Sequence, residues 1–282
     1  MYSQYLFNEL LLNPAYCGSR ISTNATLLHR NQWVAFEGAP KTSLLSFDHP
    51  LMEKNMGLGL IVANDKIGVT KQTDIYTNYS YHIRFRYSNL SFGLKTGISN
   101  YNAALTTLTV WDNDKVFAAD RNSFIIPKFG FGTYYYSEKF FVGFSIPELM
   151  AYDKNKNFSY DINKSSNIRK HYFLHSGYSH KISSSLKLKP TFLLKYLPKS
   201  PLQADLNINF IYKEIYLLGG SYRTGDALVA IIQFQIVKNL KLGYAFDYTL
   251  SKLNHYTYGS HEIMLGYDFG KNYINVNTPS MF

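Results

Sequence analysis

The chain of 282 residues is predicted to fold as an all-β protein, a transmembrane antiparallel β-barrel of about 14 strands. Three observations predict it: the composition, a period-two alternation, and connections that alternate between short and long. Tyr, Phe and Trp number 25, 20 and 2, while charged residues make up 17%, below the roughly 25% of a typical soluble domain. This balance excludes a disordered chain, and the single cysteine excludes a disulfide scaffold.

Alternation of apolar and polar residues recurs along nearly the whole chain. A strand sends successive side chains to opposite faces, so a strand with one apolar face alternates in this way. In the run from 74 to 85, for example, Tyr79 and Ile83 alternate with Asn78 and His82. Such runs predict fourteen strands, at residues 22–33, 41–49, 56–64, 73–85, 89–100, 125–136, 139–146, 171–182, 186–196, 203–212, 215–222, 228–237, 240–248 and 260–269. No uninterrupted apolar run of about 18 residues marks a transmembrane helix.

The connections between these strands alternate in length. Short links such as Tyr87-Ser88, Ser137-Glu138, Lys213-Glu214 and Lys238-Asn239 join strands in pairs. The other connections are expected to be longer loops, at 34–40, 65–72, 101–124, 147–170, 197–202, 223–227 and 249–259. All short turns then fall at one end of the sheet, as in outer-membrane barrels with short periplasmic turns and long external loops. Because the strand number is even, we expect both termini at the periplasmic end.

The two faces of the strands have different compositions. One face is Leu, Ile, Phe and Tyr, which suits lipid and the aromatic girdles at the two interfaces. The other is Ser, Thr, Asn, Gly, His and scattered Lys, which suits a hydrated lumen. A soluble sandwich or propeller would also alternate, but its polar face would be richer in Glu and Lys, and nothing would sort its loops by length. Most runs reach the 9–11 residues that a tilted membrane strand needs, so the membrane barrel is favoured.

The N-terminal segment lacks this alternation. It is rich in Leu and aromatic residues, and the pair Asn13-Pro14 marks a turn within it. Such an apolar segment needs a cover, either the barrel lumen, which it would plug, or a periplasmic partner. We predict its contact residues to be Tyr5, Phe7, Asn13, Pro14 and Tyr16. The predicted organisation is a lumen or periplasmic segment at 1–21, a transmembrane barrel at 22–270 and a periplasmic tail at 271–282.

Cys17 invites interpretation as a lipid-anchored cysteine, because Leu-rich sequence precedes it. Pro14 and the bulky Tyr16 fit poorly with small-residue processing, so an ordinary packed thiol is favoured. A signal peptide would begin with positive charge and an apolar stretch of about 7–15 residues. Here Glu9 interrupts the apolar stretch, and Arg20 is the first basic side chain.

Catalytic and metal-binding patterns are weak. His171 and His175 are four residues apart on a strand, roughly 13 Å, so they cannot share one metal ion and are expected to be lumen or rim histidines. Four Asp and Asn side chains in the longest loop could offer oxygen ligands to calcium, although they lack the Gly and distant Glu of an EF-hand: Asp112, Asn113, Asp114 and Asp120. No Ser, His and Asp are spaced as in a hydrolase. We therefore expect no enzyme, no metal and no cofactor.

The net charge of +10 could suggest nucleic-acid binding. Lys and Arg are spread over strands and loops, however, and no basic run is longer than Arg169-Lys170. A charged lumen or anionic lipid head groups explain the charge equally well. We expect no nucleic-acid partner.

Several blocks in the first 70 residues resemble the PorP/SprF family of outer-membrane proteins of Bacteroidota, which act in type IX secretion and gliding. The blocks follow in order at family-like spacing: Gln4-Tyr5-Leu6-Phe7-Asn8, Asn13-Pro14-Ala15-Tyr16-Cys17-Gly18, Arg30-Asn31-Gln32-Trp33, Gly38-Ala39-Pro40-Lys41-Thr42, Gly57-Leu58-Gly59-Leu60 and Asn64-Asp65-Lys66-Ile67-Gly68. The chain departs from the family at Glu9, where proline is common, and at Cys17, where alanine is usual. The remainder resembles the family only in length and barrel pattern.

The resemblance implies a non-enzymatic accessory protein that is integral to the outer membrane. Its implied partners are a secreted cargo protein, notably an adhesin with a C-terminal sorting domain, and outer-membrane lipid. A periplasmic peptidoglycan-linked lipoprotein and other secretion-system components are further partners that the resemblance suggests. The role would be to hold the exported protein at the cell surface.

The two longest predicted loops suggest how cargo is bound. They carry aromatic residues among polar neighbours, the composition of protein-binding hot spots, and we predict contacts through Trp111, Phe117, Phe158 and Tyr160. The same loops could instead fold inward and close the pore. Two competing functions remain open: a channel or transporter for small or hydrophobic solutes, which needs an open lumen, and a barrel-type lipid hydrolase, which needs Ser and His to meet at the lipid face.

Overall fold

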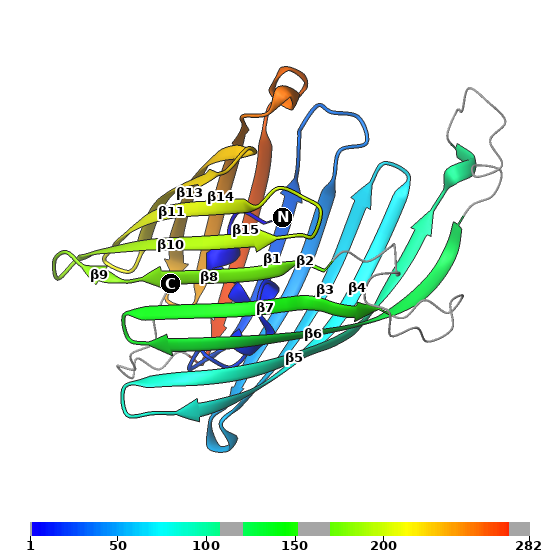
Figure 1. Ribbon diagram of the computed structural model, residues 1–282. Helices are drawn as coiled ribbons and strands as arrows, with labels where there is room; N and C mark the ends of the chain where they lie inside the picture. The colour runs from blue at the N-terminus through cyan, green and yellow to red at the C-terminus, as the bar shows by residue number, and fades with distance from the viewer. Residues whose placement is uncertain (1, 108–120, 152–169, 271–282) are drawn as a thin grey trace.

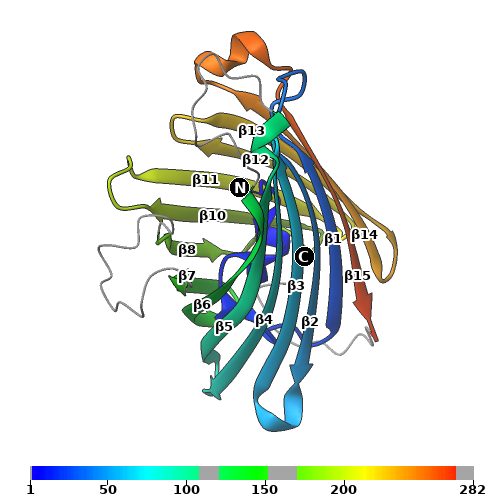
Figure 2. The ribbon, with the colours of Figure 1, turned by 90° about the vertical axis from the view of Figure 1, so that its right-hand side faces the viewer.

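A computed structural model describes residues 2–107, 121–151 and 170–270 as a closed antiparallel barrel (Figures 1 and 2). Its strands are β1 (Thr23–Asn31), β2 (Lys41–Leu51), β3 (Met56–Ile67), β4 (Thr70–Arg84), β5 (Ser88–Ala103), β6 (Arg121–Ser137), β7 (Phe140–Ala151), β8 (Tyr172–Tyr178), β9 (His180–Lys181), β10 (Leu186–Tyr196), β11 (Gln203–Tyr212), β12 (Tyr216–Arg223), β13 (Ala227–Val237), β14 (Leu240–Thr249) and β15 (Ser260–Phe269). Short 3-10 turns are η1 (Tyr5–Phe7), η2 (Glu9–Leu11), η3 (Pro14–Tyr16), η4 (Met52–Lys54), η5 (Leu105–Thr107) and η7 (Lys252–Tyr256).

Each wall strand pairs with its neighbours in sequence, and the ring closes where β15 pairs with β1. Both β8 and β9 pair with β10, with only Ser179 between them, so together they form a single wall strand. The wall therefore has fourteen strands, and the predicted fold class and strand number are confirmed.

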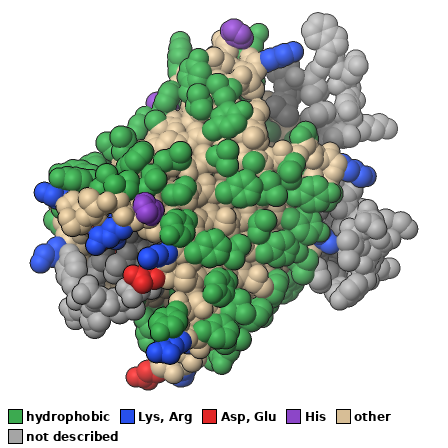
Figure 3. Space-filling view, turned by 60° about the vertical axis from the view of Figure 1, so that its left-hand side comes forward, with side chains coloured by type: hydrophobic (Ala, Val, Ile, Leu, Met, Phe, Trp, Pro, Cys, Tyr) green, Lys and Arg blue, Asp and Glu red, His purple; other side chains and the backbone are tan. Residues whose placement is uncertain are grey.

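Side chains divide between the faces as the alternation predicts. On β5, Leu94 and Ile98 face outward and are exposed, whereas Ser91 and Ser99 of the same strand face inward and are buried. Hydrophobic side chains cover much of the outer surface, as Figure 3 shows for one face. This apolar exterior is what a membrane-spanning barrel presents to lipid.

Two expected long loops are tight turns instead, so the sorting of loops by length is incomplete. The loop predicted at 65–72 is reduced to Gly68 and Val69, and the loop predicted at 223–227 comprises only residues 224–226. The strands β3 and β4 extend past their apolar stretch, because backbone hydrogen bonds between them continue where the outward residues are polar. Lys66 and Lys71, for example, are paired in this extension. Apolar alternation stops at the lipid boundary, so it underestimates strand length there.

The N-terminal segment lies inside the barrel, where Figures 1 and 2 show its coils surrounded by the wall. Tyr5, Leu10 and Tyr16 are each at most 2% exposed. Within the described part of the chain, no helix is long and apolar enough to cross a bilayer.

Candidate functional site

The segment from residue 2 to 20, which we call the lumen segment, runs along the barrel interior. Ser3 contacts Arg30 and Glu262, which lie beside the long-loop end of their strands. Further along, the backbone of Cys17 lies against Gly57, which is near the start of β3 at the short-turn end. The wall itself begins and ends at the short-turn end, as expected for an even strand number. The lumen segment then leads back from there, so Ser3 lies near the opposite end, whereas both ends of the chain were expected at the short-turn end.

A local sequence signal shapes the second half of the lumen segment. The Asn13 side chain accepts a hydrogen bond from the Ala15 amide at 2.9 Å and caps η3, and Pro14 occupies its first position. Proline is tolerated there because its missing N–H would have no partner in the first turn. Asn13 also donates from Nδ2 to the Thr133 carbonyl at 2.9 Å. One side chain therefore both forms the turn and anchors it to β6.

Wall serines bind the carbonyl groups that the 3-10 turns leave unpaired. Ser145 donates to the Leu12 carbonyl and Ser91 to the Ala15 carbonyl, both at 2.7 Å. Ser80 donates to the carbonyl of Cys17. Buried carbonyls without partners are costly, so these inward hydroxyls favour the observed position of the segment.

Inward-facing glycines make room for the lumen segment. A Cβ atom on Gly93 would lie 2.1 Å from the Ala15 nitrogen, and one on Gly132 would lie 2.0 Å from Asn13 Oδ1. On the opposite wall, a Cβ on Gly243 would lie 2.1 Å from Gln4 Oε1. The wall is therefore shaped to fit this particular segment.

Replacing Gly93 with Ala is expected to displace Ala15, because the added carbon would clash with backbone that has little freedom to move. Overpacking of this kind typically costs about 1–3 kcal/mol of unfolding free energy. The matched control is Gly266→Ala, also on the inner face, where the nearest heavy atom would be 4.0 Å away. Chemical unfolding in detergent micelles compares the two variants, and equal stabilities would contradict the fit described here.

Apolar side chains of the lumen segment pack against different parts of the wall. The Tyr16 ring meets Tyr134 edge-on, with centroids 5.5 Å apart. Phe7 belongs to a buried cluster with residues of β11 to β15: Ile211, Leu217, Val229, Ile231, Ala245 and Met264. The Tyr5 hydroxyl accepts a hydrogen bond from Asn207 at 2.7 Å. Contacts therefore come from strands all around the ring.

An ionic network binds the beginning of the lumen segment. Glu262 accepts hydrogen bonds from the backbone amides of Ser3 and Gln4 at 2.8 and 2.7 Å. Arg30 is paired with Glu262 at 3.1 Å and with Asp247 at 2.8 Å. Arg30 is 4% exposed, Asp247 2% and Glu262 0%, so these charges depend on one another for stabilisation.

The network extends around the wall. Arg223 is paired with Asp247 at 3.3 Å and with Asp205 at 3.3 Å, and Lys195 is paired with Asp205 at 3.0 Å. A separate group on β4, β6 and β7 centres on Lys128, which is 3.5 Å from Asp74. Basic and acidic side chains are therefore paired with one another in the barrel interior.

Glu9 is buried in the lumen beside His175. The carboxylate lies 3.4 Å from His175 Nε2, and the His175 ring stacks on Tyr134 with centroids 5.7 Å apart. His175 is thus a lumen histidine, as expected, while His171 is exposed. Among the described residues, no group of three or more His, Cys, Asp or Glu side chains is placed to hold a metal ion.

Cys17 is a buried free thiol in the lumen segment. Its Sγ donates to Asp48 Oδ1 at 3.3 Å, and the Gly18 amide donates to the same oxygen at 2.7 Å. Burial raises the pKa of the Cys17 thiol well above its ordinary value, and the nearby Asp48 carboxylate raises it further. The side chain is packed, as the sequence favoured.

The Cys17 thiol is therefore expected to resist maleimide in the folded barrel, because the reactive thiolate is suppressed and the sulfur is covered. We expect labelling at least about tenfold slower than in the denatured chain. Mass spectrometry over a time course measures both rates. Cys17→Ala removes the only thiol and is the blank, and rapid labelling of folded protein would show that the segment leaves the lumen.

The predicted site residues separate into two groups. Tyr5, Phe7, Asn13, Pro14 and Tyr16 all lie buried in the barrel interior. The following lie outside the described residues: the aromatic residues Trp111, Phe117, Phe158 and Tyr160, and the possible oxygen ligands Asp112, Asn113, Asp114 and Asp120.

The sequence did not single out the network of Arg30, Asp247 and Glu262. The available signal was a charged residue at an inward position of an alternating strand, which is uncommon unless the charge is paired. Strand pairing brings Ala245, rather than Asp247, opposite Glu262. Only the closed barrel brings the three charges together around Ser3.

Comparisons with known proteins agree with the membrane barrel. A family model described as "Type IX secretion system membrane protein PorP/SprF" matches residues 1–267. Among solved structures, the CymD monoaromatic hydrocarbon channel is 12% identical, with a TM-score of 0.53 and coverage of 95% of this chain and 92% of that chain. The toluene transporter TodX of P. putida is 7% identical, with a TM-score of 0.53 and coverage of 91% and 92%. At such low identity these structures show the fold alone. No curated protein matches the sequence.

Proposed function

Because the chain belongs to the PorP/SprF family of type IX secretion system membrane proteins, we propose that it is a non-enzymatic outer-membrane adaptor. It binds a secreted protein through that protein's C-terminal sorting domain, as in adhesins, and retains it at the cell surface. Association with a periplasmic peptidoglycan-linked lipoprotein or with other secretion components completes the proposed role.

The observation that carries this proposal beyond the family is the fit between the wall and the lumen segment. Gly93 leaves room for its backbone and Gly132 for the Asn13 side chain, and the carboxylate of Glu262 binds the Ser3 and Gln4 amides. A barrel interior that is specialised to hold part of its own chain favours a binding role over free passage of solutes. In this proposal the lumen segment, with Tyr5, Phe7, Asn13, Pro14 and Tyr16, plugs the barrel.

The orientation follows the rule for outer-membrane barrels, with the short turns in the periplasm and the longer loops outside. The wall then begins and ends on the periplasmic side. The strand ends that flank the connections from β5 to β6 and from β7 to β8 then lie on the outer side of the membrane, where Trp111, Phe117, Phe158 and Tyr160 are proposed to contact cargo. Aromatic side chains dominate binding energy at many protein interfaces.

The test is a mild-detergent pull-down of the tagged barrel from native membranes, with mass spectrometry of the bound proteins. Alanine at Trp111, Phe117, Phe158 and Tyr160 is expected to remove the secreted protein from the eluate. The control replaces four exposed aromatics at the short-turn end: Phe85, Tyr87, Tyr212 and Tyr216. Unchanged recovery of cargo by the loop variant would refute the loop contacts.

The runner-up function is a channel or transporter for small or hydrophobic solutes. The CymD and TodX folds are similar, but identity of 12% or less carries no function across. A full-length barrel that conducts in planar bilayers, and that copurifies with no secreted protein, would favour this alternative over the adaptor.

A further inference from the structure

Three lysines lie side by side on the outer wall near the long-loop end. Lys41 of β2 pairs in register with Lys66 of β3, and Lys66 pairs with Lys71 of β4. All three are exposed. Among the described residues, none forms an ion pair with these lysines. Like charges on directly opposed strand positions repel, so this arrangement favours an anionic ligand that would neutralise them.

A row of hydrogen-bonding side chains lies next to the lysines on the outer surface, one outward position closer to the short-turn end. His29 Nδ1 and Ser43 Oγ are 2.9 Å apart, and Asn64 Nδ2 donates to Thr73 Oγ1 at 2.9 Å. Strand register places Ser43 between His29 and Asn64. Outward positions of a membrane barrel are usually apolar, so this polar row suits a polar group at the lipid boundary.

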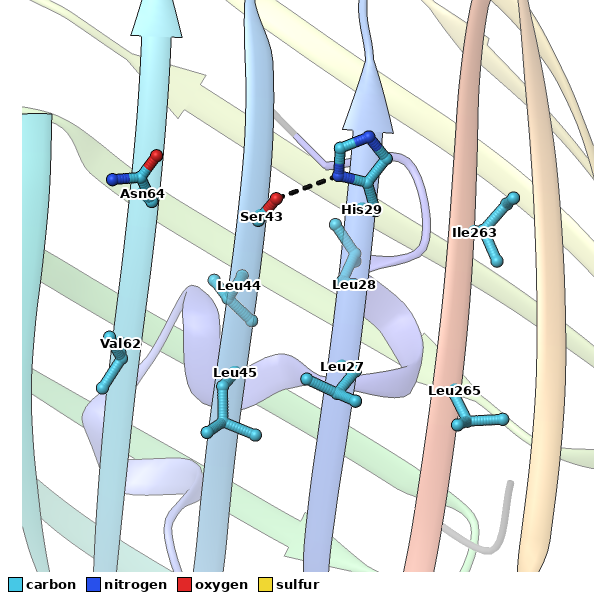
Figure 4. Close-up of a pocket in the computed structure, with 10 residues that line it drawn as sticks. All are labelled: Leu27, Leu28, His29, Ser43, Leu44, Leu45, Val62, Asn64, Ile263 and Leu265. Carbon is cyan, nitrogen blue, oxygen red and sulfur yellow. Dashed lines mark hydrogen bonds between the residues drawn. The ribbon is translucent and has the colours of Figure 1, made fainter. Parts of the chain in front are cut away.

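An apolar groove follows below the polar row. Figure 4 shows Leu27, Leu45 and Leu265 along it, with the His29–Ser43 pair at its upper end. Val62 and Ile263 also line this hollow, which has a volume of about 470 Å³. The groove is apolar along its length and polar at one end, and this polarity matches an amphiphile.

The stretch of outward-facing apolar residues is also short on β1. Only Ala25 and Leu27 face outward between Thr23 and His29, whereas outward positions on β4 are exposed from Ile75 to Ile83. A membrane strand normally needs about 9–11 residues, so the polar row reaches into the depth that lipid occupies. A bilayer adapts to such a short span by local thinning or by bringing polar groups inward.

We propose that this surface binds a phosphorylated membrane lipid of the leaflet at the long-loop end. Its phosphate lies against Lys41, Lys66 and Lys71, because ammonium groups bind phosphate as compact point charges. The polar linkage below the phosphate meets the His29–Ser43 pair, and one acyl chain occupies the groove between Leu27 and Leu45. The lipid holds the barrel at a defined depth and does not depend on the cargo role.

The experiment titrates the full-length barrel in neutral detergent with three probes and counts bound molecules by native mass spectrometry. Dioleoyl phosphatidic acid has both phosphate and chains, dioleoylglycerol lacks only the phosphate, and glycerol phosphate lacks only the chains. We expect binding of phosphatidic acid alone. Equal binding of dioleoylglycerol would show a nonspecific apolar surface, and equal binding of glycerol phosphate would show a free-phosphate site; either result overturns the proposal.

Variants locate the site. Lys41→Gln, Lys66→Gln and Lys71→Gln together are expected to weaken phosphatidic acid binding at least tenfold. The charge-matched control replaces three exposed lysines at the short-turn end with Gln: Lys54, Lys139 and Lys181. Val62→Phe, which fills the groove, is expected to weaken lipid binding as well. Heat-dependent migration on gels verifies folding, and an equal loss in the control variant would refute the location.

Discussion

Deletion of residues 2–19 is expected to convert the barrel into a conducting pore. The deletion removes the chain that packs on Gly93 and Gly132, together with the side chains of Tyr5 and Tyr16, all of which lie in the interior. The inward serines and charged groups that remain are polar and would be hydrated. Planar-bilayer recordings measure the change, with the full-length protein expected to conduct little.

Two controls make the deletion informative. Removing residues 271–282 shortens the chain at its other end and should leave the conductance at the full-length level. A synthetic peptide of residues 2–19, added to the truncated barrel, is expected to restore the block, because its binding surfaces on the wall are intact. A truncated barrel that folds but remains closed would rule out the lumen segment as the plug.

Replacing Glu262 with Gln is expected to lower the free energy of unfolding by about 3 kcal/mol, the lower end for breaking a buried ion pair. The substitution keeps the size of the side chain but removes its charge. Arg30 then keeps one ion pair, with Asp247, and its hydrogen bond to Ser3, while the Ser3 and Gln4 amides lose their anionic acceptor. Urea unfolding in detergent micelles measures the loss.

The matched control is Glu214→Gln, which breaks the ion pair with Lys187 at the short-turn end. Glu214 is 52% exposed, and exposed pairs contribute only about 0–1 kcal/mol. A double-mutant cycle with Arg30→Met isolates the coupling between Arg30 and Glu262. If the two Glu→Gln variants lose equal stability, the lumen network does not hold the segment through buried charge.

Alternation located the wall strands because burial of one face and lipid on the other impose a period of two. It stopped at residue 64 and resumed at 73, whereas the ladder continues to Ile67 and begins again at Thr70, because most residues of this stretch are polar. Strand number and closure were therefore predictable, whereas loop lengths were not. The turn at Gly68 illustrates this, since neighbouring Lys66 and Lys71 look like loop residues but pair in register.

The candidate site was only partly predictable. An apolar N-terminal segment without alternation was visible in Tyr5, Phe7 and Tyr16, because apolar side chains must be covered somewhere. Its direction was not visible, since nothing local specifies that Ser3 lies near the long-loop end. That position depends on Glu262, which is 259 residues away in the chain.

By itself, the sequence determined the closed fourteen-strand barrel, its lipid-facing side and the family, because period-two patterning and short motifs are local properties of the chain. Only the tertiary structure decided what the interior holds, because closing the ring brings Gly93, Glu262 and Ser145 around one segment. The register between the neighbouring strands β2, β3 and β4 likewise set the lysine row on the outer wall, because it aligns residues that alternation treats separately. Local pattern specifies a strand's faces, and only the assembled barrel specifies which residues from distant strands become neighbours.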